Sequence, residues 1–299
     1  EIAKALDRSP STISREVSAG SCNKYTYRAG TAQRRAGRNS KKRKKDNRKI
    51  DGNPKLRRYI YRTLRLKWSP VQIARMLKKE YPLDMTMRVS AEAIYAYLYV
   101  LPRGSLKKEL LSCLRQNRKR RHPQRRGVKC QRNIQDMLSI EERPTEVLNR
   151  IIPGHWEGDL IMGKNNRSAL GTLVERTTRT TILIPVPNKQ AEVVAKAFAK
   201  ETKKLPTQMK LSLTYDQGRE MAAHKLFTAI TGVKVYFAHP RSPWERGTNE
   251  NTNGLIRQFF PKGTDFHHIT RKEVKRVQHL LNGRPRKTLN WQTPYEVFN

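Results

Sequence analysis

Two stretches of nearly unbroken charge constrain the fold of this 299-residue chain more than any other feature. The first covers residues 41–49 and the second covers residues 118–126. Like charges repel one another and bury no apolar surface, so neither stretch can contribute to a hydrophobic core. We expect both to be extended linkers that become ordered only against a polyanion. A solvated spacer without a specific role is the alternative.

These linkers divide the chain into three structured parts. The predicted divisions are a small basic helical module at 1–38, a basic linker at 39–53, a second helical module at 54–115, a second basic linker at 116–148 and an α/β domain at 149–299.

The excess of positive charge indicates the kind of partner. The chain carries 63 Lys and Arg against 25 Asp and Glu, a net charge of +38. Such an excess destabilises a compact protein by self-repulsion unless a polyanion neutralises it. Nucleic acid is the usual polyanion, and a membrane surface is the weaker alternative. We expect the basic linkers to contact DNA through Lys42, Arg43, Arg120 and Arg121.

The cysteines and the hydropathy pattern indicate a reducing compartment and no membrane. Cys22, Cys113 and Cys130 are scattered and odd in number, which argues against a disulfide framework. No apolar run approaches the ~18 residues of a membrane span, and no signal peptide is visible. We therefore predict a cytoplasmic protein. The chain begins at Glu1 inside a helical pattern, so we expect the first module to be truncated at its N-terminus.

The front module has the pattern of a helix-turn-helix. Ser9 is placed to cap a helix whose first residue is Pro10, and Ile13 and Val17 share its inner face. Small hydroxyls allow close approach to a DNA groove, and an arginine reaches a base edge or a phosphate. The predicted DNA-contacting residues of this helix are Ser11, Thr12, Ser14 and Arg15.

The second module also has the pattern of capped helices with an apolar face. Ser69 and Gln72 are spaced for a capping box, and Ser90 begins another helix. Ile73, Met76 and Leu77 form the apolar stripe of the first of these helices, while Ala93, Ile94, Tyr97 and Leu98 share one face of the second. We interpret this part as a second helix-turn-helix.

The last part alternates predicted strands and helices. The expected strands are 153–163, one or two within 168–186, 211–216 and 233–237, and the expected helices are 189–204, 220–230 and 248–260. The first strand places Glu157, Asp159 and Ile161 on one face. A carboxylate in mid-strand is costly to bury unless it binds a cation.

Two further acids lie at positions that are common for active-site residues. Asp216 ends the strand at 211–216, and ends of strands in α/β sheets carry many active sites. Glu250 lies on a helix, on the same side as Asn253 and Arg257.

The short sequence motifs around these acids are long enough to be specific for one protein family. Asp159, Asp216 and Glu250 occur in that order, with 33 residues between the last two. They stand within HWEGD at 155–159, YDQG at 215–218 and RGTNENTNGLIR at 246–257, and the chain closes with NGRPR at 282–286 and TP at 293–294. At these residues, and across essentially the whole chain, the sequence resembles the bacterial insertion sequence thirty family of DDE transposases, whose cores are similar to retroviral integrases.

The resemblance implies a fold and a chemistry. The fold is an α/β ribonuclease-H-like catalytic core, preceded by all-α helix-turn-helix DNA-binding modules. Asp159, Asp216 and Glu250 are then the catalytic residues and the metal ligands, with Mg²⁺ as the cofactor, two ions expected and Mn²⁺ able to substitute. The enzyme would bind transposon ends, hydrolyse phosphodiester bonds to free 3′-OH ends and join them to target DNA. The truncated first module is the departure from the family pattern, and it puts recognition of specific ends in doubt.

Alternatives stay open on the residues alone. Glu157 and Glu245 compete as site acids, although each could form an ion pair in so basic a chain. Asn253 and Arg257 are candidate DNA contacts or solvated helix-surface residues. A non-catalytic helix-turn-helix regulator or a metal nuclease that does not join DNA are the rival functions. Double-stranded DNA is the expected partner, bound by a homodimer or a larger assembly at the bacterial nucleoid.

Overall fold

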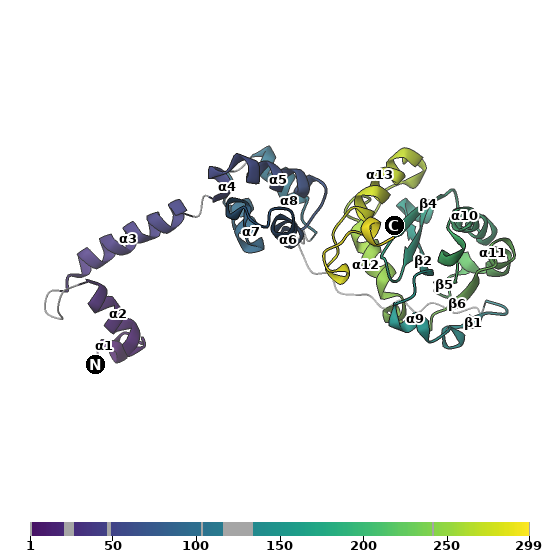
Figure 1. Cartoon of the computed structure of the whole chain (residues 1–299), viewed down its shortest axis with the longest axis horizontal. Helices are drawn as coiled ribbons and strands as arrows, with labels where there is room; N and C mark the ends of the chain where they lie inside the picture. The colour runs from purple at the N-terminus through teal and green to yellow at the C-terminus, as the bar shows by residue number, and fades with distance from the viewer. Residues whose placement is uncertain are drawn as a thin grey trace. The chain divides into compact units, whose positions relative to one another are not determined.

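The computed structural model describes residues 2–20, 27–46, 49–102, 104–115, 134–240 and 242–298. They form two compact units. The first consists of Glu1–Tyr61 with Asp84–Met87, and the second of Arg62–Leu83 with Arg88–Asn299. The catalytic region predicted from the sequence lies entirely within the second unit (Figure 1).

The first unit is helical, as predicted. Its elements are α1 (Ile2–Ala5), α2 (Pro10–Gly20), α3 (Ala29–Asp46), α4 (Lys49–Gly52) and the start of α5 (Pro54–Arg65). The hydroxyl and the carbonyl of Ser9 both accept the N–H of Thr12, at 3.2 and 2.9 Å. The predicted start of the second helix at Ser9–Pro10 is therefore confirmed.

The prediction that residues 41–49 are extended is wrong for most of that stretch. Residues 41–46 continue α3, and Lys49 begins α4. Lysine and arginine have high intrinsic helix propensity, and here the helix has already been nucleated from Ala29. Adding a residue to an existing helix costs far less than starting one, so charge repulsion does not stop it. Lys42 and Arg43 thus lie on α3.

Four helices form the second module, and two of them begin where the sequence placed them. The four helices are α5, α6 (Pro70–Glu80), α7 (Ala91–Val100) and α8 (Ser105–Ser112). Ser69 and Gln72 form the predicted capping box, and Ser90 accepts the N–H of Ala93 at 3.0 Å. The predicted apolar stripe of α6 is buried, and so are Ile94 and Leu98 of α7. Ala93, predicted on the same face, is exposed.

A six-stranded mixed sheet is the centre of the second unit, with the order β1-β6-β5-β2-β3-β4. Its strands are β1 (Leu138–Ser139), β2 (His155–Met162), β3 (Ala169–Glu175), β4 (Thr181–Val186), β5 (Ser212–Tyr215) and β6 (Lys234–Phe237). β2, β3 and β4 form an antiparallel meander, whereas β5 and β6 run parallel to β2. The two strands that carry the first and second predicted acids are therefore direct neighbours.

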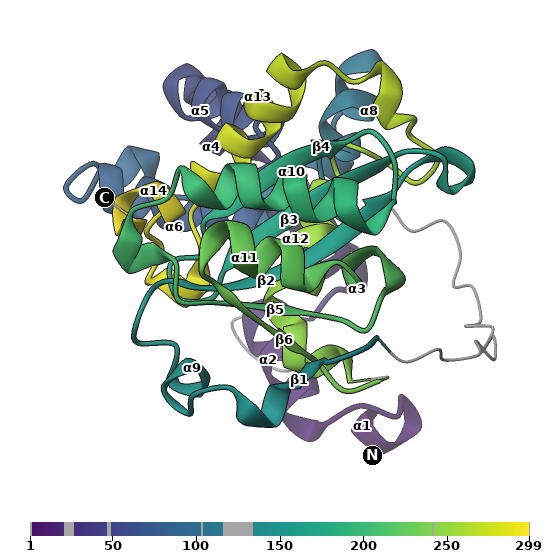
Figure 2. The same ribbon diagram turned by 90° about the vertical axis from the view of Figure 1, so that its right-hand side faces the viewer.

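Helices cover both faces of this sheet (Figure 2). α10 (Ala191–Lys203) and α11 (His224–Thr231) pack on one face, where the core includes Leu160 and Phe198. α12 (Gly247–Ile256) and α13 (Arg271–Asn282) cover the other, where Ile161 meets Ile256. Leu160 and Ile161 belong to different cores because successive strand residues point to opposite faces. Asp159 has the same parity as Ile161 and thus faces α12.

The prediction of a linker over 116–148 is wrong at its C-terminal end. Residues 116–133 lie outside the described residues, but β1 pairs in parallel with β6 and extends the sheet. Arg143 is buried, and its Nη1 donates to the Thr214 hydroxyl at 3.0 Å. Ile134 and Met137 pack against the core. Two paired residues give no periodic signal, so the sequence alone did not reveal this strand.

The remaining elements are short. They are α9 (Glu146–Asn149), α14 (Pro294–Phe298) and the 3₁₀ turns η1 (Met85–Met87), η2 (Ile140–Glu142), η3 (Lys164–Asn166), η4 (Thr207–Met209), η5 (Arg219–Met221), η6 (Pro243–Arg246), η7 (Phe266–His268) and η8 (Lys287–Leu289). The segment between the expected strand at 233–237 and the expected helix at 248–260 contains η6. The helix predicted over 220–230 is divided into η5 and α11.

Candidate active site

The two acids of β2 share a face but have different surroundings. Glu157 is fully buried: its Oε2 accepts the backbone N–H of Asn249 at 2.8 Å, and its Oε1 lies 3.2 Å from the Arg176 guanidinium. Arg176 is itself buried. A buried charge that is paired and hydrogen-bonded in this way ties α12 to the sheet. Glu157 therefore forms a structural ion pair, which was one of the two roles that the sequence left open for it.

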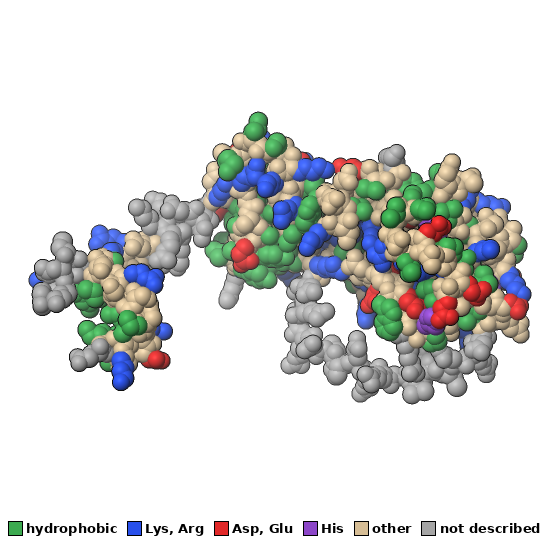
Figure 3. Space-filling model, turned by 60° about the horizontal axis from the view of Figure 1, so that its bottom comes forward, with side chains coloured by type: hydrophobic (Ala, Val, Ile, Leu, Met, Phe, Trp, Pro, Cys, Tyr) green, Lys and Arg blue, Asp and Glu red, His purple; other side chains and the backbone are tan. Residues whose placement is uncertain are grey.

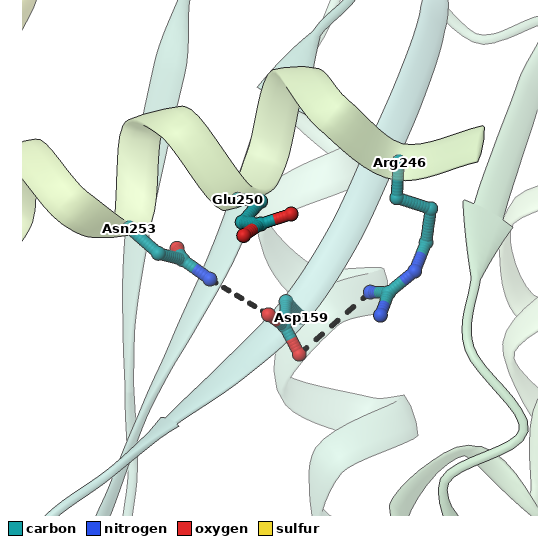
Figure 4. A pocket seen from close by; sticks show the side chains of 4 residues that line it. All are labelled: Asp159, Arg246, Glu250 and Asn253. Carbon is teal, nitrogen blue, oxygen red and sulfur yellow. Dashed lines mark hydrogen bonds and ion pairs between the residues drawn. The ribbon is translucent and has the colours of Figure 1, made fainter. Parts of the chain in front are cut away.

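Asp159 instead opens onto a cavity. Its Oδ2 accepts the Asn253 side-chain amide at 2.7 Å, and its Oδ1 lies 3.8 Å from the guanidinium of Arg246 (Figure 4). About a quarter of its side chain, 24%, is exposed. Partial burial raises the pKa of Asp159 to about 6, although the positive charge of Arg246 opposes this shift. The neighbouring negative charge of Asp216 contributes to it.

Asp216 follows β5 and is held by the same arginine. Arg246 donates through Nη2 to Asp216 Oδ2 at 2.9 Å and through Nη1 to the Gly158 carbonyl at 3.1 Å. The N–H of Gly218 donates to the other oxygen of Asp216 at 3.1 Å. One guanidinium thus bridges the first and second predicted acids. The tertiary structure alone reveals this role of Arg246.

Glu250 and Asn253 reach the cavity from α12, one helical turn apart. The cavity is about 200 Å³ and is lined by Asp159, Arg246, Glu250 and Asn253. Figure 4 shows the side chains of Asn253 and Arg246 approaching Asp159 from opposite sides, with Glu250 on the helix above it. Leu255 and Ile256 anchor the opposite face of α12 in the core. The packing of α12 therefore places Glu250 beside Asp159.

The donor groups match a hard divalent cation. Among the described residues, no three His, Cys, Asp or Glu side chains converge tightly enough to hold an ion, and Asp216 is hydrogen-bonded to Arg246. A positive group nevertheless already lies between Asp159 and Asp216. The groups around it offer oxygen donors, including the buried Oδ1 of Asn253, which has no hydrogen-bond partner. Oxygen-only sites suit Mg²⁺ and Mn²⁺.

The residues predicted to contact DNA lie in several places. On α2, the four predicted side chains are exposed while Ile13 and Val17 are partly buried, so the polar face is as expected. Arg15 donates to the carbonyl and hydroxyl of Ser11. Arg120 and Arg121 lie outside the described residues.

On α12, the two residues that were predicted to contact DNA form hydrogen bonds within the protein. Asn253 holds Asp159, and Arg257 donates to the carbonyls of Met162 and Pro261, at 2.8 and 3.3 Å. The competing acid Glu245 accepts from the N–H and the ring of His239, at 2.7 and 2.8 Å. Neither Arg257 nor Glu245 lines the cavity that contains Asp159 and Glu250, which we call the carboxylate cavity.

The strand order β4-β3-β2-β5-β6, with Asp159 on β2, Asp216 directly after β5 and Glu250 on the following helix α12, is that of a ribonuclease-H-like integrase core. The family model "Integrase core domain" matches residues 151–243. The protein is thus an enzyme of the polynucleotidyl transferase class.

Relatives identify the family within this class. The chain is 44% identical to the transposase for insertion sequence element IS1086 of Cupriavidus metallidurans, over 99% of this chain and 87% of that protein. It is 45% identical to transposase InsI for insertion sequence element IS30A of Escherichia coli, over 99% and 77%. It is 35% identical to the transposase for IS4351 of Bacteroides fragilis, over 99% and 88%. The chain belongs to the insertion sequence thirty (IS30) family of transposases.

Membership of this transposase family establishes the general function of the protein. The protein is a catalytic transposase that acts on DNA, and these relatives lend no support to the alternative of a non-catalytic regulator. Enzymes of this class generally use divalent metal ions. Among the described helices, none is both long and apolar enough to cross a bilayer.

Proposed function

We propose that Asp159, Asp216 and Glu250 are the catalytic carboxylates and hold two Mg²⁺ ions, for which Mn²⁺ substitutes. The observation that carries this proposal is the position of Asp159. It lines one cavity with Glu250 and is connected to Asp216 by the guanidinium of Arg246. A bridging cation in that position is what two neighbouring carboxylates require when no metal neutralises them.

The proposed reaction has two steps on phosphodiester bonds. Hydrolysis at a transposon end frees a 3′-OH, and this hydroxyl then displaces a 3′-oxygen in target DNA, so that one bond forms for each one broken. Bound divalent ions would activate the attacking oxygen and stabilise the leaving oxygen. Asp159 would face both ions, with Asp216 and Glu250 each facing one.

The residues around the acids would position them. Asn253 donates to Asp159 Oδ2, which directs the other carboxylate oxygen toward Arg246. Arg246 would leave Asp216 when a metal takes over its charge, and the Nη2 group that Asp216 now accepts from would then be free for a DNA phosphate. The carbonyl of Gly158 offers the guanidinium a second anchor during this exchange.

The decisive experiment combines joining and metal binding. In a strand-transfer assay with Mg²⁺ and DNA carrying the element's ends, we expect joined product from the wild type. Asp216→Asn should abolish both cleavage and joining while DNA binding persists. Mn²⁺ binding measured by electron paramagnetic resonance should weaken in the same variant. Full activity of Asp216→Asn would remove this residue from the mechanism, and cleavage without joining by the wild type would leave only a nuclease.

We also propose roles for the other parts of the chain. Helix α2 would enter a DNA groove through Ser11, Thr12, Ser14 and Arg15, since these side chains form its exposed polar face. The helices α5–α8 would form the second helix-turn-helix module. The basic segments would follow the phosphate backbone through Lys42, Arg43, Arg120 and Arg121. A base-substitution scan of the element's ends, compared for wild type and Arg15→Ala, tests the first assignment.

The assembly is expected to be a homodimer or larger on DNA, because two ends have to be brought together. Light scattering with and without end DNA would test this, and a monomer under both conditions would contradict it. As an enzyme of chromosomal DNA, the protein would act at the bacterial nucleoid in the cytoplasm.

A further inference from the structure

A second cavity on the core gathers positive charge away from the carboxylates. It has a volume of about 220 Å³ and is lined by Arg150, Arg179 and Arg286 together with polar groups of Thr248, Asn251 and Thr288. It shares helix α12 with the carboxylate cavity but uses other positions of that helix. The arginines come from three separate parts of the chain, so only the fold brings them together.

Among the described residues, these arginines are not paired with carboxylates, although the more distant charges of Glu157 and Glu175 favour the charged form of Arg179. Within the described parts of the chain, none of the three guanidinium groups forms an ion pair with a carboxylate. Arg179 donates to the Thr248 hydroxyl at 2.6 Å and Arg286 to the Leu281 carbonyl at 3.1 Å. The Nε groups of Arg179 and Arg286 are buried and have no hydrogen-bond partner. Several donors are therefore left for a ligand.

The cluster is electrostatically unfavourable without an anion. Burial, and after it the charge of Arg179, lowers the pKa of Arg286 to about 10. Nearby Arg284 is almost fully buried, and its Nη1 donates to a neutral group, the Gln258 side chain, at 2.9 Å. Like charges brought together away from water destabilise a protein unless a counter-charge is bound.

We propose that this cavity binds a backbone phosphate of DNA, separate from the bond that is cut. A phosphodiester carries a negative charge and acceptor oxygens, which guanidinium forks and hydroxyls recognise together. Thr248 and Asn251 flank Glu250 in the sequence, so the bound phosphate would hold the duplex against the helix that carries a catalytic acid. The inference rests on the proposed function in that it takes DNA as the ligand.

The test measures the DNA affinity of the whole 299-residue chain in EDTA, so that no cleavage takes place. Fluorescence anisotropy over a series of NaCl concentrations gives the slope of log K against log salt. Each phosphate contact contributes about 0.9 to that slope. We expect Arg150→Gln/Arg179→Gln to reduce the slope by about 0.9. Arg150→Gln alone, at an exposed position that folding tolerates, should reduce it in the same direction, and Arg150→Lys should restore most of it.

The matched controls are Arg271→Gln for the single variant and Arg271→Gln/Arg276→Gln for the double variant, because each removes the same number of charges from exposed positions of α13. Ethylation interference supplies a second readout, because it identifies the phosphates whose modification blocks binding. The double variant should lose one interference position that its control keeps. A slope and an interference pattern equal to those of the matched control, in a variant that melts like the wild type, would overturn the proposal.

Two probes distinguish the source of the phosphate. One is a short duplex of mixed sequence, and the other is a duplex of equal length carrying the element's end. If the variants reduce the salt slope with both duplexes, the cavity binds a phosphate of any duplex. If they reduce it only with the duplex that carries the element's end, the cavity binds a phosphate of end DNA. Because the assay needs no metal, it stays informative if Asp216→Asn retains cleavage, which would refute only the carboxylate assignment.

Discussion

At the scale of single residues, Glu157 and Asp159 show how context separates two similar side chains. They stand two positions apart on the same face of β2. Glu157 is enclosed by a backbone N–H and a buried arginine, whereas Asp159 faces a cavity with one amide and a more distant guanidinium. An enclosed carboxylate that is paired with a buried arginine supports the fold, and an accessible one remains available for chemistry.

This contrast predicts opposite effects of two isosteric substitutions. Glu157→Gln weakens a buried charge pair and should lower the free energy of unfolding by about 1–3 kcal/mol while folded protein still cleaves DNA. Asp159→Asn should leave the protein folded and reduce cleavage by at least about 10³-fold, by analogy with the loss of one strong electrostatic contribution. Urea unfolding and single-turnover cleavage measure the two effects. Normal cleavage by Asp159→Asn would contradict the assignment.

The pKa of Asp159 predicts a stability change with pH in metal-free buffer. Burial raises this pKa from 3.8 to about 6, so the folded state keeps the proton that the unfolded chain releases. The contribution of Asp159 to stability is thus complete below pH 4 and is lost as pH rises through about 6.

The loss should amount to about 1–3 kcal/mol. Denaturant titrations of wild type and Asp159→Asn between these pH values measure it as the difference between the two proteins. Identical pH profiles for both would show that Asp159 titrates normally in the fold.

At the scale of elements, the site depends on close contact between β2 and β5. A Cβ added at Gly158 would lie 2.6 Å from the Tyr215 ring, next to Asp216. Tyr215 is fully buried, so it has no free space into which to move. Glycine is therefore required between Glu157 and Asp159.

Two glycine substitutions should accordingly have opposite signs. Gly158→Ala is expected to destabilise the core by about 1–3 kcal/mol and to displace Asp216. Gly254→Ala, whose nearest neighbour is Arg115 Nη2 at 3.7 Å, replaces a mid-helix glycine and should stabilise by about 0.5–1 kcal/mol. Midpoints of urea unfolding provide the comparison. Equal midpoints would show that β2 and β5 adjust to the added methyl group.

At the scale of the whole molecule, charge determines how the protein meets DNA. Lys and Arg side chains are spread over the surface in Figure 3, while Asp and Glu are fewer. Binding to a mixed-sequence duplex should therefore depend steeply on salt. If six or more phosphates are neutralised, affinity should fall by about 10³-fold or more between 50 and 200 mM salt. Anisotropy titrations measure this fall, and a nearly flat dependence would mean that most of the charge does not touch DNA.

Local patterns predicted much of this architecture. Ser69 with Gln72 predicted a helix start because a cap involves only neighbouring residues. The pattern over 153–163 predicted the first strand, and the motifs around Asp159, Asp216 and Glu250 predicted the family. The pattern did not predict the helix at 41–46, because net repulsion was weighed above the propensity of lysine and arginine, nor β1, which is too short for periodicity.

The sequence by itself determined the types of most elements and the family, and it named three candidate acids, because short-range spacing and specific motifs carry this information. Only the tertiary structure decided that Glu157 is enclosed while Asp159 is accessible, that Arg246 lies between two acids, and that Arg150, Arg179 and Arg286 share a cavity. Those outcomes depend on the strand order β5-β2-β3 and on where α12 crosses the sheet. Such contacts join residues far apart along the chain, and local spacing carries no information about them.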